Sequence, residues 1–300
     1  MFRSKHRKYA VAVGKLNGKD PLDIRNIEFK FIDAGLHCWV ADPFPIEYEG
    51  ELYIFGELLF YKKAKGTIGY TKLTGSGFTT WKEVIEEPYH LSFPNLMKID
   101  GELYMCPESI ESKQLYLYKC IVFPDIWEKD VVLCDNCEYS DTIYYKDSWN
   151  NYGFTCLWKG IEDHKLGIFK INDKNQCTLS DGNIRMEQFW TSRPAGQIFY
   201  SPSLERKIMV SQVCKPQYGC GLAFKKFNLS WPDYTEEVIE QVFPKEICCD
   251  VKRDWIGMHT YNISENYAVI DFVYMGFSPV ELFYRGYRKL KRIRKEISEK

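Results

Sequence analysis

The stretch Ala41-Asp42-Pro43-Phe44-Pro45-Ile46 leads through Tyr48-Glu49-Gly50 into Glu51-Leu52-Tyr53-Ile54-Phe55-Gly56-Glu57. A second copy of this pattern occupies residues 92–108, where Gly101-Glu102-Leu103-Tyr104 repeats Gly50-Glu51-Leu52-Tyr53. In both copies an apolar segment precedes a tight turn and a second apolar segment follows it. Each turn carries glycine where a two-residue hairpin turn requires positive φ. The two stretches therefore predict the same β-hairpin, used twice.

Weaker copies of the hairpin begin near residues 140, 192 and 258. With Asp42, Pro94, Asp141, Arg193 and His259 taken as equivalent points, the spacings are 52, 47, 52 and 66 residues. A second apolar hairpin follows most copies, and two hairpins make one four-stranded propeller blade.

The repeats predict an all-β fold, a five-bladed β-propeller with four-stranded antiparallel blades around a central funnel. We expect the propeller over residues 1–284, with blades starting near 41, 92, 140, 192 and 258. The fifth blade is short after Asp271, and Phe29-Lys30-Phe31-Ile32 would complete it and close the ring. A β-sandwich of irregular hairpins is the alternative.

Composition limits the classes of protein that this chain resembles. Hydrophobic residues make up 45% of the chain and aromatic residues 16%, which suits a large β core. The 40 basic and 41 acidic residues argue against a general nucleic-acid binder. The apolar stretch Tyr9–Val13 is too short for a signal peptide, so we expect a cytoplasmic protein. Its 11 cysteines would then be reduced, and the single pair Cys134 and Cys137 predicts no metal site.

Propeller geometry places a set of polar side chains at one end of the funnel. Each inner strand would start at this mouth, and the antiparallel second strand would end there. Clustered carboxylates repel one another, so at least one of them should have a raised pKa. The set has five carboxylates, two histidines, one arginine, one glutamine and one aromatic ring: Asp42, Glu57, His90, Glu108, Asp141, Trp158, Arg193, Gln212, His259 and Asp271.

Several short strings resemble the five-bladed propeller superfamily of arabinanases, β-xylosidases and invertases. The chain more closely resembles the N-terminal domain of glucosamine inositolphosphorylceramide transferases and its bacterial homologues. The strings that carry this resemblance are Ala41-Asp42-Pro43-Phe44, His90-Leu91-Ser92-Phe93-Pro94, Pro107-Glu108-Ser109, Ser192-Arg193-Pro194-Ala195-Gly196, Gln217-Tyr218-Gly219 and His259-Thr260-Tyr261-Asn262.

The resemblance to the hydrolases implies catalytic roles. Asp42 matches the base or nucleophile, and Asp141 matches the carboxylate that tunes the acid. The general acid is usually a glutamate on the fourth blade, where this chain has Arg193. Glu108 is the best substitute acid, and Glu57 ranks next. Some propellers hold a structural Ca²⁺ in the channel; we otherwise expect no cofactor.

The remaining polar residues of the set would bind substrate. Arg193 suits a phosphate, a sugar carboxylate or one of the acids themselves. His90 and His259 suit hydroxyl binding or proton transfer, and an ordinary structural role is the alternative. We group Glu57, His90, Trp158, Arg193, Gln212, His259 and Asp271 as substrate-binding candidates.

The tail 285–300 is predicted to be a basic helix. Seven of the eleven residues 285–295 are Lys or Arg, and Tyr287, Leu290, Ile293 and Ile297 follow helical spacing. This pattern is typical of a helix on an anionic membrane surface, here the inner face, and a solvated helix is the alternative.

Three functions follow for the whole chain. The first is an enzyme acting on a glycosidic bond, by hydrolysis or by transfer from an activated sugar. The second is a non-catalytic glycan-binding propeller, and the third is a membrane-edge scaffold for a glycosyltransferase. Carboxyl separations of about 5–5.5 Å or about 6.5–9.5 Å would favour hydrolysis. Ion pairs between these carboxylates and Arg193 would favour binding instead.

Overall fold

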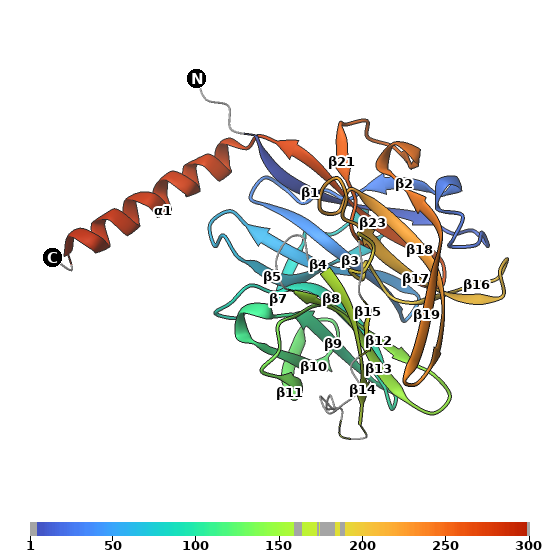
Figure 1. The fold of residues 1–300 in the computed structure, drawn as a ribbon. Helices are drawn as coiled ribbons and strands as arrows, with labels where there is room; N and C mark the ends of the chain where they lie inside the picture. Colours follow the sequence, from blue (N-terminus) through green and yellow to red (C-terminus); the bar gives the residue numbers. More distant parts are fainter. Residues whose placement is uncertain (1–4, 159–163, 173, 175–183, 187–189, 299–300) are drawn as a thin grey trace.

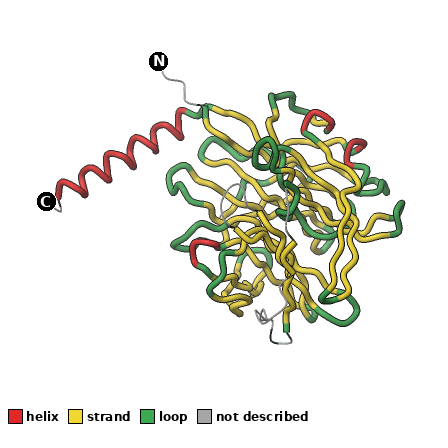
Figure 2. Tube along the Cα trace, in the orientation of Figure 1, coloured by secondary structure: helices red, strands yellow, loops and turns green. Residues whose placement is uncertain are grey.

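The computed structural model describes residues 5–158, 164–172, 174, 184–186 and 190–298. Five small antiparallel sheets surround a common centre, and a single long helix projects from the body (Figures 1 and 2). This arrangement confirms the five-bladed β-propeller. Among the described helices, none combines the length and apolar character needed to cross a bilayer.

The first three blades follow the chain in order. Blade 1 contains β3 (Cys38–Tyr48), β4 (Glu51–Phe60) and β5 (Gly66–Thr74), with β6 (Gly77–Phe78) and β7 (Lys82–Ile85) both paired to β5. Blade 2 contains β8 (Ser92–Ile99), β9 (Glu102–Glu108), β10 (Gln114–Val122) and β11 (Ile126–Asp135). Blade 3 contains β12 (Tyr139–Lys146), β13 (Asn151–Trp158), β14 (His164–Ile171) and β15 (Ile184–Met186).

The last two blades are less regular. Blade 4 contains β16 (Phe199–Ser201), β17 (Arg206–Val213), β18 (Gly221–Ser230) and β19 (Asp233–Val242). Blade 5 contains β22 (Tyr261–Ile263), β23 (Tyr267–Gly276), β1 (His6–Lys15) and β2 (Glu28–Phe31), with β20 (Cys248–Cys249) on β2 and β21 (Trp255–Gly257) on β23. Short 3-10 turns occur at Ile24–Asn26, Ile110–Ser112 and Pro244–Glu246, and α1 spans Pro279–Ser298.

The N-terminal and C-terminal strands of the propeller meet in blade 5. β1 pairs with β23 along ten residues, from His6 opposite Gly276 to Lys15 opposite Tyr267. β2 then pairs with β1. The segment 29–32 was therefore rightly expected to help close the ring, but β1 makes the closing contact. In the sequence this strand is visible only as a short apolar stretch, because its partner β23 lies at the other end of the chain.

The inner strands of blades 1 to 3 share one local distortion near the funnel. The strand register shifts after Ala41, Ser92 and Ser140, and the next residue in each case has positive φ: Asp42 (50°), Phe93 (47°) and Asp141 (49°). Bulges of this kind often re-aim side chains beside functional sites. Phe93, not Pro94, is therefore the equivalent of Asp42 in blade 2.

The turns that join the two strands of the hairpins in blades 1 and 2 have the predicted conformation. Glu49 and Gly50 both have positive φ, as do Asp100 and Gly101, which matches a type I′ turn. These turns lie a strand length away from the bulges, because the inner strand runs between them. They mark the far side of the propeller from the mouth.

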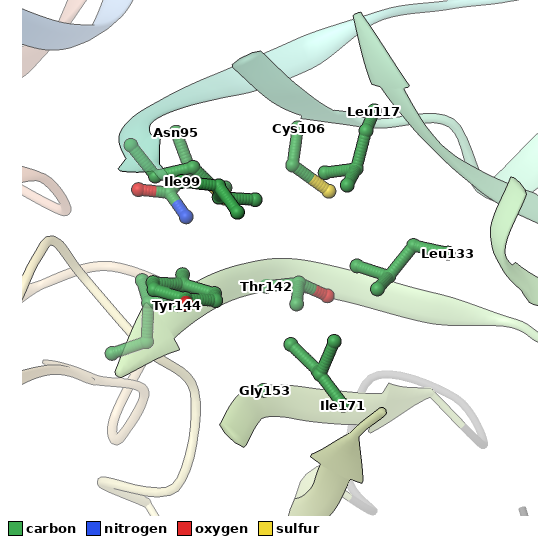
Figure 3. Close-up of a pocket in the computed structure, with 11 residues that line it drawn as sticks. Asn95, Ile99, Cys106, Leu117, Leu133, Thr142, Tyr144, Gly153 and Ile171 are labelled. Atoms are coloured by element: carbon green, nitrogen blue, oxygen red, sulfur yellow. The ribbon is translucent and has the colours of Figure 1, made fainter. Parts of the chain in front are cut away.

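The seam between blades 2 and 3 is closely packed. Figure 3 shows apolar side chains such as Ile99, Leu117, Leu133 and Ile171 facing one another across a small gap. The volume open to a water-sized sphere is about 10 Å³, roughly enough for one water molecule. A sugar does not fit here.

Candidate functional site

The structure brings most of the predicted polar set into contact at the mouth. The bulges of β3 and β12 present Asp42 and Asp141. Glu57 on β4 lies opposite Ala41 at the β3 bulge, and Glu108 on β9 lies opposite Ser92 at the β8 bulge. The contacts form three groups. They are Asp42 with His259 and Asp271; Asp141 with Arg193, Glu108 and Gln212; and Glu57 with His90.

The first group joins blades 1 and 5 through a buried ion pair. The Asp271 carboxylate accepts hydrogen bonds from the backbone N–H groups of His259 (3.0 Å), Thr260 (3.0 Å) and Asp42 (3.1 Å). Its Oδ2 also lies 2.7 Å from His259 Nδ1. Asp42 in turn accepts from the Thr260 hydroxyl (2.6 Å) and from the Phe93 N–H (3.1 Å). Both carboxylates are therefore held in fixed orientations.

Burial and charge set the protonation of this group. Burial alone would lower the pKa of His259, but Asp271 and Asp42 attract the imidazolium and raise it to about 9. Burial raises the pKa of Asp42 to about 7, although the His259 charge opposes this. The raised pKa agrees with the expectation of at least one such carboxyl. His259 therefore favours its charged form, and Asp42 holds a proton more readily than an exposed aspartate does.

The second group is centred on Arg193. Its Nε contacts Asp141 Oδ2, and its Nη2 lies 3.4 Å from Glu108 Oε2. Gln212 donates to the same Asp141 oxygen (2.9 Å), and the Asp141 N–H donates to Glu108 (3.1 Å). Burial, followed by the Asp141 charge, raises the pKa of Glu108 well above its usual range. The arginine thus occupies the fourth-blade position and pairs with two of the carboxylates proposed for catalysis.

The third group lies beside a close passage of the chain. His90 Nε2 is 3.2 Å from Glu57 Oε1, and the Gly66 N–H donates to His90 Nδ1 (3.0 Å). A Cβ on Gly66 would lie 2.8 Å from that Glu57 oxygen and 2.3 Å from a backbone carbonyl. Burial would lower the pKa of His90, but Glu57 raises it above its ordinary value. Glycine at 66 is therefore needed for this pair to form.

Aromatic residues that the sequence analysis did not select line the same mouth. The Tyr9 ring lies 4.7 Å and the Tyr218 ring 5.9 Å from the His259 ring. The Arg193 guanidinium lies 5.1 Å from the Tyr218 ring and links the first two groups. Arg7 donates to the Tyr218 carbonyl (2.5 Å). The string Gln217-Tyr218-Gly219 carried a signal for Tyr218, whereas Tyr9 became visible only once β1 was placed.

Trp158 is the one selected residue without a described contact at the mouth. It ends β13 and pairs there with His164; its side chain lies outside the described residues. The register places Cys156 opposite Ser140, where Glu57 and Glu108 stand in blades 1 and 2. The prediction took the last residue of β13, whereas the residue opposite the inner strand at the mouth is Cys156, two positions earlier.

Within the described part of the chain, one set of side chains has the spacing of a cation site. Ligand atoms of Asp42, His259 and Asp271 all lie within 4.8 Å of one another. Asp271 already accepts three backbone hydrogen bonds, and its Oδ2 lies 2.7 Å from His259 Nδ1. Ca²⁺ takes six to eight oxygen ligands, so a Ca²⁺ held by these three side chains would need further oxygen ligands.

Comparison of the sequence with known families shows the family to which the chain belongs. The family described as "Glucosamine inositolphosphorylceramide transferase 1, N-terminal" matches residues 29–266. The chain belongs to this family. The Arabidopsis thaliana protein of that name is 30% identical over 249 residues, which are 77% of this chain and 31% of that protein. The protein from Oryza sativa subsp. indica is 28% identical over 289 residues, 84% of this chain and 37% of the relative. This chain thus spans about a third of the relatives' length.

Solved structures share the fold of this family member at low sequence identity. The catalytic domain of a Coprinopsis cinerea GH62 α-L-arabinofuranosidase has a TM-score of 0.56 at 9% identity, and the match covers 78% of this chain and 90% of that one. An α-L-arabinofuranosidase from Lactobacillus brevis has a TM-score of 0.54 at 11% identity, with 78% and 83% covered. These likenesses concern the fold alone.

Proposed function

We propose that the funnel mouth binds a sugar without hydrolysing it, as the recognition module of a glycosyl-transfer reaction. The observation that carries this proposal is the position of Arg193. It holds Asp141 and Glu108 in ion pairs at the place where the hydrolase pattern would put a general acid. A guanidinium has no proton to give at neutral pH, so it cannot act as that acid. Ion pairing with Arg193 was the arrangement expected of a binding module.

The chemistry of the mouth favours an amino sugar. Tyr9 and Tyr218 lie beside the carboxylates at the mouth, and aromatic rings suit the apolar side of a pyranose. Asp42, Glu57 and Glu108 are acceptors for hydroxyl groups and for an ammonium group. The relatives are named as glucosamine inositolphosphorylceramide transferases, which is consistent with a glucosamine unit as the ligand.

Calorimetric titration with glucosamine-terminated and N-acetylglucosamine-terminated oligosaccharides tests this function. We expect the free amine to bind more tightly, because the mouth is rich in carboxylates. Tyr218→Ala should weaken binding about tenfold or more, since an aromatic contact and its buried area are lost. Tyr200→Ala is the matched control, because Tyr200 is an exposed tyrosine on β16 away from the mouth set. Equal affinities for the two variants, or no binding of any glycan, would contradict the proposal.

A second candidate function rests on the raised pKa values. A general base works best with a pKa near the operating pH, and the pKa of Asp42 is about 7. A protonated Glu108 would supply the acid. This reading requires turnover of a glycoside by the wild-type chain, lost in Asp42→Asn while sugar binding remains. Binding without turnover in the wild type would leave recognition as the function.

A further inference from the structure

Helix α1 presents an apolar stripe that nothing in the described chain covers. Phe283 and Leu290 are 68% and 60% exposed, although the helix is part of an otherwise well-packed chain. Figure 1 shows α1 projecting from the body. The exposed apolar residues fall on an arc of about 140° at 3.6 residues per turn. They are Leu282, Phe283, Tyr287, Leu290 and Ile293.

The opposite side of the helix is strongly basic. Residues 285–295 include seven Lys or Arg and no acidic residue. Lys289 and Lys291 are exposed. An apolar stripe bordered by cations complements a bilayer surface with anionic headgroups, where apolar side chains enter the interface and cations meet phosphates. A protein groove would have to match the stripe with apolar surface and the other side with acidic side chains.

The root of α1 is fixed to the propeller by buried polar contacts. Lys8 on β1 lies 2.9 Å from Glu281 and donates to the Tyr61 hydroxyl (2.6 Å). Arg288 donates to the Tyr61 carbonyl. Lys8, Tyr61 and Glu281 are all buried. The first turns of the helix therefore have one orientation relative to the blades.

This root lies on the same side of the propeller as the sugar site. β23 carries Asp271 at the mouth, continues for five residues to Gly276 and leads directly into α1. Tyr61 follows β4 shortly after Glu57, another mouth residue. A surface bound by α1 would therefore lie near the mouth and not at the turns of the far side.

We propose that α1 docks on an anionic membrane surface and holds the funnel mouth close to it. This step rests on the proposed function: the sugar bound at the mouth would then be the headgroup of a lipid in that membrane. Docking itself depends only on α1 and its root. It can therefore be tested apart from sugar binding.

Sedimentation with sucrose-loaded vesicles of phosphatidylcholine, alone or with 30% phosphatidylglycerol, tests docking. We expect binding to the anionic vesicles only, weakened by salt. Lys289→Glu with Lys291→Glu should lower the partition coefficient more than twentyfold, at about fivefold per basic residue removed. Lys98→Glu with Lys245→Glu is the charge-matched control on exposed sites of the body. Phe283→Ser with Leu290→Ser should also abolish binding. Ile121→Ser with Ile126→Ser, which changes two exposed apolar residues of blade 2, should not.

Hydrogen exchange on the same vesicles tests the placement of the mouth. We expect protection of α1 and of residues 61–64 at the rim, with none at the turns 49–50 and 100–101. Protection of α1 without the rim would overturn the placement. Equal binding to both vesicle types, or α1 variants that bind like their controls, would overturn docking. Dimers that depend on Phe283 and Leu290, without vesicle binding, would assign the stripe to a second copy of the chain.

Soluble-sugar titration of the α1 variants separates the two proposals. Affinity equal to that of the wild type is expected, because none of the substituted residues lies at the mouth. Vesicle binding without any sugar binding would contradict the proposed function and leave docking in place. Loss of sugar binding in the α1 variants would show that the helix supports the fold of the mouth, and would overturn its assignment as a separate docking element.

Discussion

At the scale of single residues, the ionisation of His259 should make the free energy of unfolding depend on pH in a definite direction. Its pKa is raised from an ordinary 6.5 to about 9 by Asp271 and Asp42, against the effect of burial. A group whose pKa is higher in the folded protein contributes stability below its unfolded pKa, and loses it as pH rises through the folded value. The free energy of unfolding should therefore fall between about pH 6.5 and pH 9, by on the order of 3 kcal/mol from this residue.

Urea unfolding of wild type and His259→Gln at pH 6 and pH 9 measures this contribution. The variant should be less stable at pH 6 and should show a smaller loss on going to pH 9. The His259 charge also lowers the pKa of Asp42, so the comparison between variants measures the ion pair as a whole. His37→Gln, at an exposed position, is the control and should follow the wild type. Parallel pH curves for wild type and His259→Gln would contradict the ion pair.

Single residues of the mouth could be predicted from the sequence, but their contacts could not. Asp42, Asp141 and Arg193 were found from strand position alone, and the structure places them at the mouth because the repeat fixes where each inner strand begins. Their partners were not predictable in the same way. The contact of Arg193 with Asp141 depends on side chains from two blades, and pairing across blades leaves no periodic trace in the sequence.

At the scale of elements, the loop before β18 depends on one glycine. Gly219 has φ of 60°, and a Cβ there would lie 2.9 Å from the Cβ of His259. Its carbonyl also accepts a hydrogen bond from the Met258 N–H (3.0 Å). The loop can therefore bring Tyr218 over the mouth only if residue 219 has no side chain.

Gly219→Ala should destabilise the fold and weaken sugar binding together. The left-handed conformation costs a residue with a Cβ roughly 1–2 kcal/mol, and displacement of His259 adds to it. Gly18→Ala is the matched control, since Gly18 also has positive φ (75°) but has open space around it. The control should lose only the conformational part in chemical unfolding and should bind sugar normally. Equal losses for the two variants would contradict the close contact with His259.

Elements were predicted well where a repeat or a period was present, and poorly where pairing was distant. The hairpins of blades 1 and 2 could be predicted, because glycine turns and alternating apolar residues are patterns of neighbouring residues in the sequence. Helix α1 was expected from residue 285, but it begins at Pro279, where Ser278 accepts the Glu281 N–H (3.2 Å) and a proline opens the first turn. β1 was missed because its partner β23 lies more than 250 residues away.

At the scale of the whole molecule, that distant pairing joins the five blades into a ring. Val11 and Ala12 on β1 are buried at 1% and 0% exposure between blade 5 and its neighbours. Without β1, blade 5 would keep β22 and β23 but lose the strand that connects them to β2. The stability of the ring should therefore depend on a strand at the opposite end of the chain from the blade it completes.

Ala12→Asp tests this dependence, because it places an unpaired charge at a fully buried position of the closing strand. We expect a loss of more than about 3 kcal/mol in the free energy of unfolding. The loss should appear in one transition that tryptophan fluorescence and far-UV circular dichroism report alike, since an open ring exposes blade 1 as well as blade 5. Lys15→Asp, at the exposed end of the same strand, should change little. A variant in which blade 5 unfolds first, while the other blades keep their own later transition, would show that the blades are stable without closure.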